Sequence, residues 1–271
     1  MNYGGENDFR FDRDTIERNC EEFYSLYNGM RGDVHNMCER KKIHTREVAK
    51  NCQLIAEKMS LSEYECDMAR VIGLLHDFAR FGQAVRTHSF NDNERFDHAK
   101  LGARLLFTHR LVDDIIPDYD KIPEADRIVM EKAIYHHSDY VLVDDLSERE
   151  LLFCNIIRDA DKLDIFRVVA TGGPESIYGC SLEELRNTDI SPAIEAAFYE
   201  HRVAEYPKRV TKADYLMAHI ALFFGLEEES TKQRAIEQGY LEKMMDVEFA
   251  DPVVQKKYLG MIEQLRTWGR L

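Results

Sequence analysis

The feature that most constrains the fold is a set of metal-capable residues placed on the apolar stripes of five different helical segments. Apolar side chains recur every three or four residues along most of the chain, which is the pattern of helices that bury one face. His44, His76, His98, His136 and Asp161 each fall in register with such a stripe. Any one of them could be an ordinary hydrogen-bonded core residue. Burying all five costs about 1–3 kcal/mol for each polar group left unpaired, whereas a shared metal ion would satisfy them together.

The helical pattern extends over almost the whole chain, so we expect an all-α protein. Four tetrapeptides have the capping-box form, and they begin at Ser62, Ser147, Ser181 and Ser230. Only residues 140–143 offer a short run of strand-forming residues, and that run can equally be a loop. The predicted helices cover residues 13–28, 35–58, 62–78, 97–108, 124–137, 149–170, 181–187, 191–204, 212–225, 231–247 and 253–268.

The strongest break in the pattern is Thr171-Gly172-Gly173-Pro174. We therefore predict an N-terminal helix within residues 1–34, a helical domain over 35–174, and a C-terminal helical extension over 175–271 that packs on that domain. The extension holds only two of the ten histidines. We also expect the polar segment from Arg86 to Asp97 to be a long loop.

Composition excludes several classes of function. There are 36 lysines and arginines against 50 acidic residues, and the resulting net charge of −14 argues against broad binding to nucleic acid or to anionic membranes. No apolar segment is long enough to span a bilayer, and the N-terminus lacks the basic and apolar parts of a secretory signal. The six cysteines include no C-x-x-C pair, which favours reduced thiols and a cytoplasmic protein.

Some of the metal-capable residues also form an ordered motif. His44, the pair His76-Asp77 and Asp161 follow one another in the pattern H…HD…D. This pattern resembles the signature of the HD-domain superfamily of metal-dependent phosphohydrolases, over roughly residues 40 to 170. The resemblance implies an all-helical HD bundle in which His44, His76 and Asp161 hold a metal ion.

His98 and His136 look like the additional histidines of the dinuclear members of that superfamily. The resemblance then implies that these two residues hold a second ion and that Asp77 bridges the pair. The implied cofactors are one or two divalent transition metal ions, namely Fe, Mn, Ni, Co or Zn, with Mg as a further option. A mononuclear site stays open.

The implied activity is hydrolysis of a phosphoester or phosphoanhydride, with a nucleotide as the small-molecule partner and a metal-bridging hydroxide as the nucleophile. His137 is a candidate for a leaving-group acid. Arg80, Lys162 and Asp97 are candidates for contacts with the substrate, the two cations by neutralising phosphate oxygens. The alternatives for Arg80 and Lys162 are ion pairs with neighbouring acids.

Three other functions compete with hydrolysis of a small phosphorylated molecule. Some HD proteins hold mixed-valent di-iron with a similar ligand set and act as oxygenases, and a non-catalytic nucleotide-sensing regulator is a second alternative. A nuclease is disfavoured by the net charge. No G-Y-P element accompanies His137, so an assignment as a cyclic-di-GMP phosphodiesterase does not carry over. Homo-oligomerisation stays open.

Overall fold

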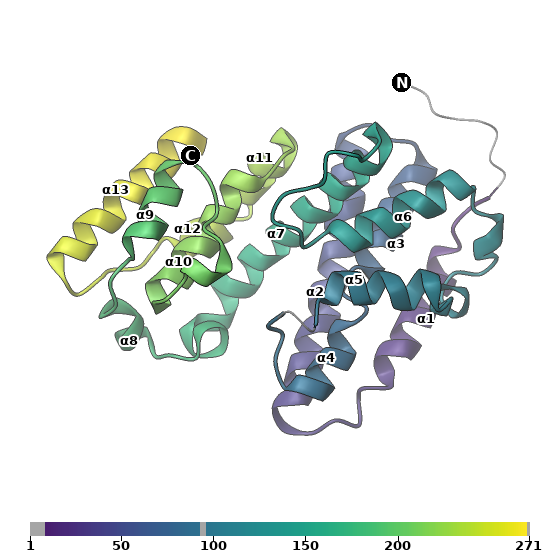
Figure 1. Ribbon diagram of the computed structural model, residues 1–271, viewed down its shortest axis with the longest axis horizontal. Helices are drawn as coiled ribbons and strands as arrows, with labels where there is room; N and C mark the ends of the chain where they lie inside the picture. The colour runs from purple at the N-terminus through teal and green to yellow at the C-terminus, as the bar shows by residue number, and fades with distance from the viewer. Residues whose placement is uncertain (1–8, 93–95, 270–271) are drawn as a thin grey trace. The chain divides into compact units, whose positions relative to one another are not determined.

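The computed structural model describes residues 9–92 and 96–269, and these residues form helices joined by loops without any strand (Figure 1). The all-α prediction is therefore confirmed. Residues 1–8 of the predicted N-terminal segment, 93–95 of the predicted loop and 270–271 lie outside the described residues. In the described part of the chain, no helix combines the length and the apolar character needed to cross a bilayer.

The chain divides into two compact units, residues 1–160 and 161–271. The predicted division at residues 34 and 174 stays a prediction. The first unit consists of α1 (Arg13–Ser25), α2 (Gly32–Lys58), α3 (Glu63–Leu75), α4 (Arg80–Thr87), α5 (His98–Ala103), the π-helical turn η1 (Arg104–Thr108), the 3₁₀ turns η2 (Leu111–Asp114) and η3 (Tyr119–Lys121), α6 (Glu124–His136) and the first part of α7 (Glu148–Tyr178).

Helices α2 and α3 pack against each other at the centre of the first unit. Their close approach depends on Gly73, because a Cβ atom at this position would lie only 2.6 Å from the Cα atom of Ala49. Side chains along both helices are fully buried, among them Val48, Met68 and Ile72. This helix pair therefore provides the rigid support for the polar residues described below.

The predicted break after residue 170 is a kink within α7. Gly173 has φ 71° and ψ 163°, which lies outside the helical region, and Pro174 follows it. A positive φ is accessible to glycine without steric cost, and proline has no N–H with which to continue the helical hydrogen bonds. The helical segment nevertheless resumes beyond the kink and ends at Tyr178.

The second unit contains the rest of α7 and a set of shorter helices. They are α8 (Leu182–Arg186), α9 (Pro192–Tyr199), η4 (Tyr206–Lys208), α10 (Lys212–Ala221), η5 (Leu222–Gly225), α11 (Glu229–Glu237), α12 (Tyr240–Met244) and α13 (Pro252–Gly269). The single helix predicted over 231–247 is wrong, because Gly239 adopts φ 70° and separates α11 from α12. Phe198, Phe223 and Tyr258 are among the large side chains buried in this unit.

Three of the four predicted capping boxes are present. Ser62, Ser147 and Ser181 each exchange hydrogen bonds with the glutamate three residues later. The prediction at Ser230 is wrong, because α11 already begins at Glu229. A further capping box is present at Thr211, and its acidic residue is the aspartate Asp214 instead of a glutamate.

Candidate metal centre

The pair His76-Asp77 lies at the tight turn that follows α3. Both side chains are buried, with 0% and 3% of their surface exposed. Nδ1 of His76 lies 2.8 Å from the carbonyl oxygen of Gly73, and since that oxygen can only accept, Nδ1 must carry the proton. In the neutral form of the ring, Nε2 is then the nitrogen that carries the lone pair. This buried atom has no hydrogen-bond partner among the described residues.

The carboxylate of Asp77 lies at the centre of four imidazole rings. Its Oδ2 atom lies 3.3 Å from Nε2 of His76 and 3.5 Å from Nε2 of His44. Its Oδ1 atom lies 3.4 Å from Nε2 of His98 and 4.0 Å from Nε2 of His137. The four histidines come from α2, the end of α3, the start of α5 and the end of α6. Each carboxylate oxygen thus faces a different pair of histidines.

The rings of His98 and His137, like that of His76, are each oriented by a hydrogen bond that Nδ1 donates to an oxygen atom. Nδ1 of His137 donates to the carbonyl oxygen of Ile134 at 2.7 Å, and Nδ1 of His98 donates to the carboxylate of Asp92. Burial lowers the pKa of His98, although the bond to Asp92 opposes this effect. Neutral imidazoles held by their Nδ1 protons present Nε2 as a metal ligand.

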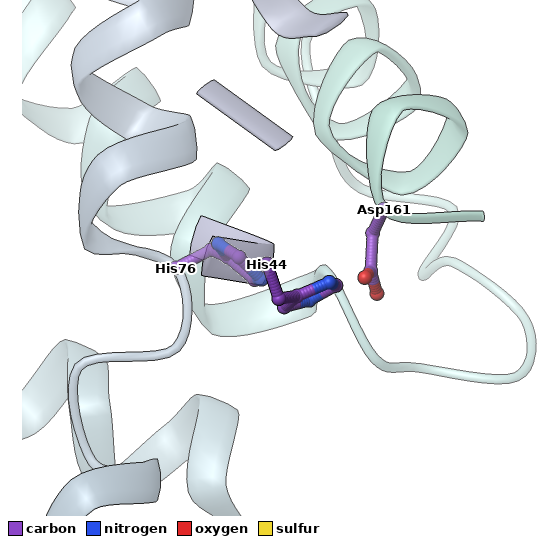
Figure 2. Close-up of side chains that lie close together, drawn as sticks. All are labelled: His44, His76 and Asp161. Carbon is purple, nitrogen blue, oxygen red and sulfur yellow. The ribbon is translucent and has the colours of Figure 1, made fainter. Parts of the chain in front are cut away.

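A group of three potential ligands includes an aspartate from α7. The ligand atoms of His44, His76 and Asp161 all lie within 4.8 Å of one another, and Figure 2 shows the His44 ring pointing toward the Asp161 carboxylate. Asp161 follows the last residue of the first unit within a continuous stretch of α7. A second group of this kind is His76, Asp77 and His137.

The structure brings His137 to this cluster and does not bring His136. Nδ1 of His136 lies 2.6 Å from the carboxylate of Asp139, and no group of converging ligand atoms among the described residues includes His136. The sequence contained a signal for His137: it continues the stripe of Met130 and Ala133, both fully buried, at helical spacing. The apolar register that His136 continues includes Ile128, which is 43% exposed.

Two cations face Asp77. Nζ of Lys41 forms an ion pair with Oδ2, and Nε of Arg80 lies 3.4 Å from Oδ1. Burial alone would raise the pKa of Asp77, but the Lys41 ammonium and the neighbouring His76 hold that pKa well below its ordinary value. Sequence reasoning missed Lys41, although it precedes His44 by three residues and so shares its helix face.

Arg80 is fixed by several acceptors besides Asp77. Its Nη1 atom donates to the carbonyl oxygen of Phe90 at 2.5 Å, to Oδ1 of Asp92 at 2.8 Å and to Oε1 of Gln83 at 2.7 Å. Asp92, which also holds His98, was likewise missed, because it lies in a loop that has no helical periodicity. Arg80 therefore ties the start of α4 to the loop that supports His98.

Lys162 and Asp97 are the other two candidates for contacts with the substrate, and each forms hydrogen bonds within the protein. Nζ of Lys162 donates a hydrogen bond to the carbonyl oxygen of Gly225. Asp97 caps α5, where it accepts from the backbone N–H of Lys100 at 3.1 Å and from Nζ of the same residue at 2.7 Å. Asp97 also forms a group of potential ligands with Asp92 and His98.

Fold and geometry define a helical protein with a buried cluster of histidines around an aspartate. Residues 42–165 match the family model of the HD domain, and this stretch includes every member of the cluster. The match covers slightly less than half of the chain, and over these residues the chain is similar to HD domains, a family whose members bind divalent metal ions and are generally hydrolases. Comparison of the chain with curated proteins and with solved structures finds no match.

The residues present suit a divalent ion. Imidazole nitrogens and carboxylate oxygens are the ligands that transition metals prefer, and His76 offers a buried Nε2 lone pair with no hydrogen-bond partner in the described ranges. Three of the rings are held through Nδ1, which is usual for histidines that bind metal through Nε2. The acceptors are the carbonyl oxygens of Gly73 and Ile134 and the carboxylate of Asp92.

Proposed function

We propose that this protein is a metal-dependent phosphohydrolase that acts on a small phosphorylated molecule, for which a nucleotide is the simplest candidate. The observation that supports this proposal is the position of Asp77, whose two carboxylate oxygens each face a separate pair of imidazole nitrogens. A carboxylate in this position can bridge two ions, and two-ion centres are common in enzymes that transfer or hydrolyse phosphoryl groups.

The proposed ligand set divides into two groups that share Asp77. His44, His76 and Asp161 would hold the first ion. His98 would hold the second, together with His137 in place of His136, because only His137 turns its Nε2 atom toward Asp77. The metal stays open among Fe, Mn, Ni, Co, Zn and Mg, since sites of this composition accept several ions.

When bound, such ions would activate water as a nucleophile and neutralise charge on the phosphoryl group. The protein's own residues hold the ligands in place. The Gly73 carbonyl and the Asp92 carboxylate hold the rings of His76 and His98 so that both Nε2 atoms face Asp77. Arg80 holds Asp92 in turn, so its role is to position the loop that supports His98.

The test combines elemental analysis of the purified protein with a phosphate-release screen over nucleotides and dinucleotides. We expect bound transition metal, phosphate release, and loss of both in Asp77→Asn. Lys50→Gln is the matched control, because Lys50 lies exposed on α2 and pairs only with Glu47 in the described structure. It should behave as the wild type.

Two results would contradict hydrolysis and favour a competing function. Oxygen consumption by the iron-loaded protein without phosphate release from any nucleotide would indicate a di-iron oxygenase. Stoichiometric nucleotide binding without turnover, in the presence of each candidate metal, would indicate a regulator.

A further inference from the structure

Lys41 contacts the atom at which two of the proposed ligands converge. Its Nζ atom pairs with Oδ2 of Asp77, the same oxygen that lies 3.5 Å from His44 and 3.3 Å from His76. An ammonium group and a divalent cation compete for a carboxylate oxygen, because each is attracted by the same charge and each repels the other. The geometry therefore brings a protein cation to an oxygen that a metal would use.

The two cations beside Asp77 differ in their freedom to move. Arg80 is anchored by Gln83, by the backbone of Phe90 and by Asp92. Lys41 has Asp77 as its only ion-pair partner in the described ranges. Its side chain is 18% exposed, and its Nζ atom lies 5.4 Å from the centre of the Phe90 ring. A lysine carries its charge on a flexible four-carbon stem and can move it toward solvent.

We propose that Lys41 is a built-in competitor for the metal: it neutralises Asp77 in the metal-free protein and leaves Oδ2 when an ion binds. This inference rests on the proposed metal site. Lys41 keeps a buried carboxylate paired before metal loading, since an unpaired buried charge is strongly destabilising. The same pairing weakens metal binding, because the ion must first displace the ammonium group. Lys41 thus sets the metal affinity of the centre without being a ligand.

Displacement can be measured in the wild-type protein by amine labelling. The metal-free and Mn²⁺-loaded proteins are treated with an acylating reagent, and modification of each lysine is quantified by mass spectrometry. We expect the reactivity of Lys41 to rise several-fold on Mn²⁺ loading while that of Lys50 stays constant. Unchanged or reduced reactivity of Lys41 in protein shown to hold Mn²⁺ would overturn the inference and leave the metal site intact.

Affinity provides a second, independent readout. Titration calorimetry with Mn²⁺ should show that Lys41→Gln binds the ion about tenfold more tightly than the wild type, whereas Lys50→Gln is unchanged. Equal or weaker binding by Lys41→Gln would overturn the inference. If the wild type binds no Mn²⁺ or other candidate metal, both the metal site and the inference fail. Should Lys41→Gln not fold, the labelling experiment on the wild type decides.

Discussion

The Nε2 atoms of His98 and His137 lie 2.9 Å apart, and both rings already donate their Nδ1 protons to other acceptors. Two neutral rings in this arrangement would bring two lone pairs face to face, which is repulsive. A cation shared by both nitrogens removes the repulsion. A cation is therefore favoured at this contact, which lies beside Oδ1 of Asp77.

Separate substitution of the adjacent residues His136 and His137 tests which of them binds metal. We expect His137→Ala to lower metal affinity about 10–100-fold, whereas His136→Ala retains the wild-type metal content. The reason is that only His137 faces Asp77, while His136 is paired with Asp139. Metal content after dialysis against a weak chelator measures the difference. The reverse ranking of the two variants would restore His136 as the ligand.

Substitution of two aspartates near α5 distinguishes a residue that supports the metal site from one that caps the helix. Asp92→Asn should weaken metal binding about tenfold or more, because Asp92 orients His98. Asp97→Asn should leave metal binding unchanged, because Asp97 caps the helix and asparagine is also a good cap. Calorimetric titration with Mn²⁺ gives both values. Equal losses in the two variants would count against an orienting role for Asp92.

Two glycines provide a matched test of the helix packing beneath the site. Gly73→Ala should destabilise the protein by about 1–3 kcal/mol or more, because the added Cβ would meet the backbone of Ala49. Gly82→Ala, within α4, meets no atom within 4 Å and should stabilise by about 0.5–1 kcal/mol. Urea unfolding of the metal-free protein measures both changes. A neutral Gly73→Ala would show that α2 and α3 can separate without cost.

The second unit should contribute its own acid sensitivity through His219. Burial lowers the pKa of His219 to about 4, and its Nδ1 atom lies 3.1 Å from the hydroxyl of Tyr178. Because the unfolded chain takes up this proton near pH 6.5 and the folded chain resists it, stability falls as the pH drops from about 6.5 to about 4. His219 as a whole residue is partly exposed, so we expect a loss of at most roughly 1 kcal/mol per pH unit.

The control for this acid effect is His219→Asn, which cannot be protonated. The difference in unfolding free energy between about pH 7 and about pH 5 should be smaller in the variant than in the wild type. An identical pH dependence would show that His219 does not cause the acid sensitivity.

Helix content was predictable because it depends on local patterns. The stripes of α2 and α6 and the caps at Ser62 and Ser181 can be read from neighbouring residues. The break at Gly239 was missed, since glycine is tolerated within helices and only its backbone conformation separates α11 from α12.

The candidate site was predictable in part for the same reason. Apolar stripes identify His44, His76 and His98 as inward-facing, and the structure brings all three to Asp77. The contact of Asp92 with His98 could not be predicted from the sequence, because it depends on how a loop folds back. The hydrogen bond of Lys162 to the Gly225 backbone could not be predicted either, because it joins residues far apart in the chain.

The most direct test of a two-ion centre at Asp77 is a crystal structure of the Mn²⁺-loaded protein, with anomalous scattering used to locate the metal. We predict two anomalous peaks on opposite oxygens of Asp77, one contacting His44, His76 and Asp161 and the other contacting His98 and His137. A loaded protein whose metal peaks lie away from Asp77 would contradict this prediction.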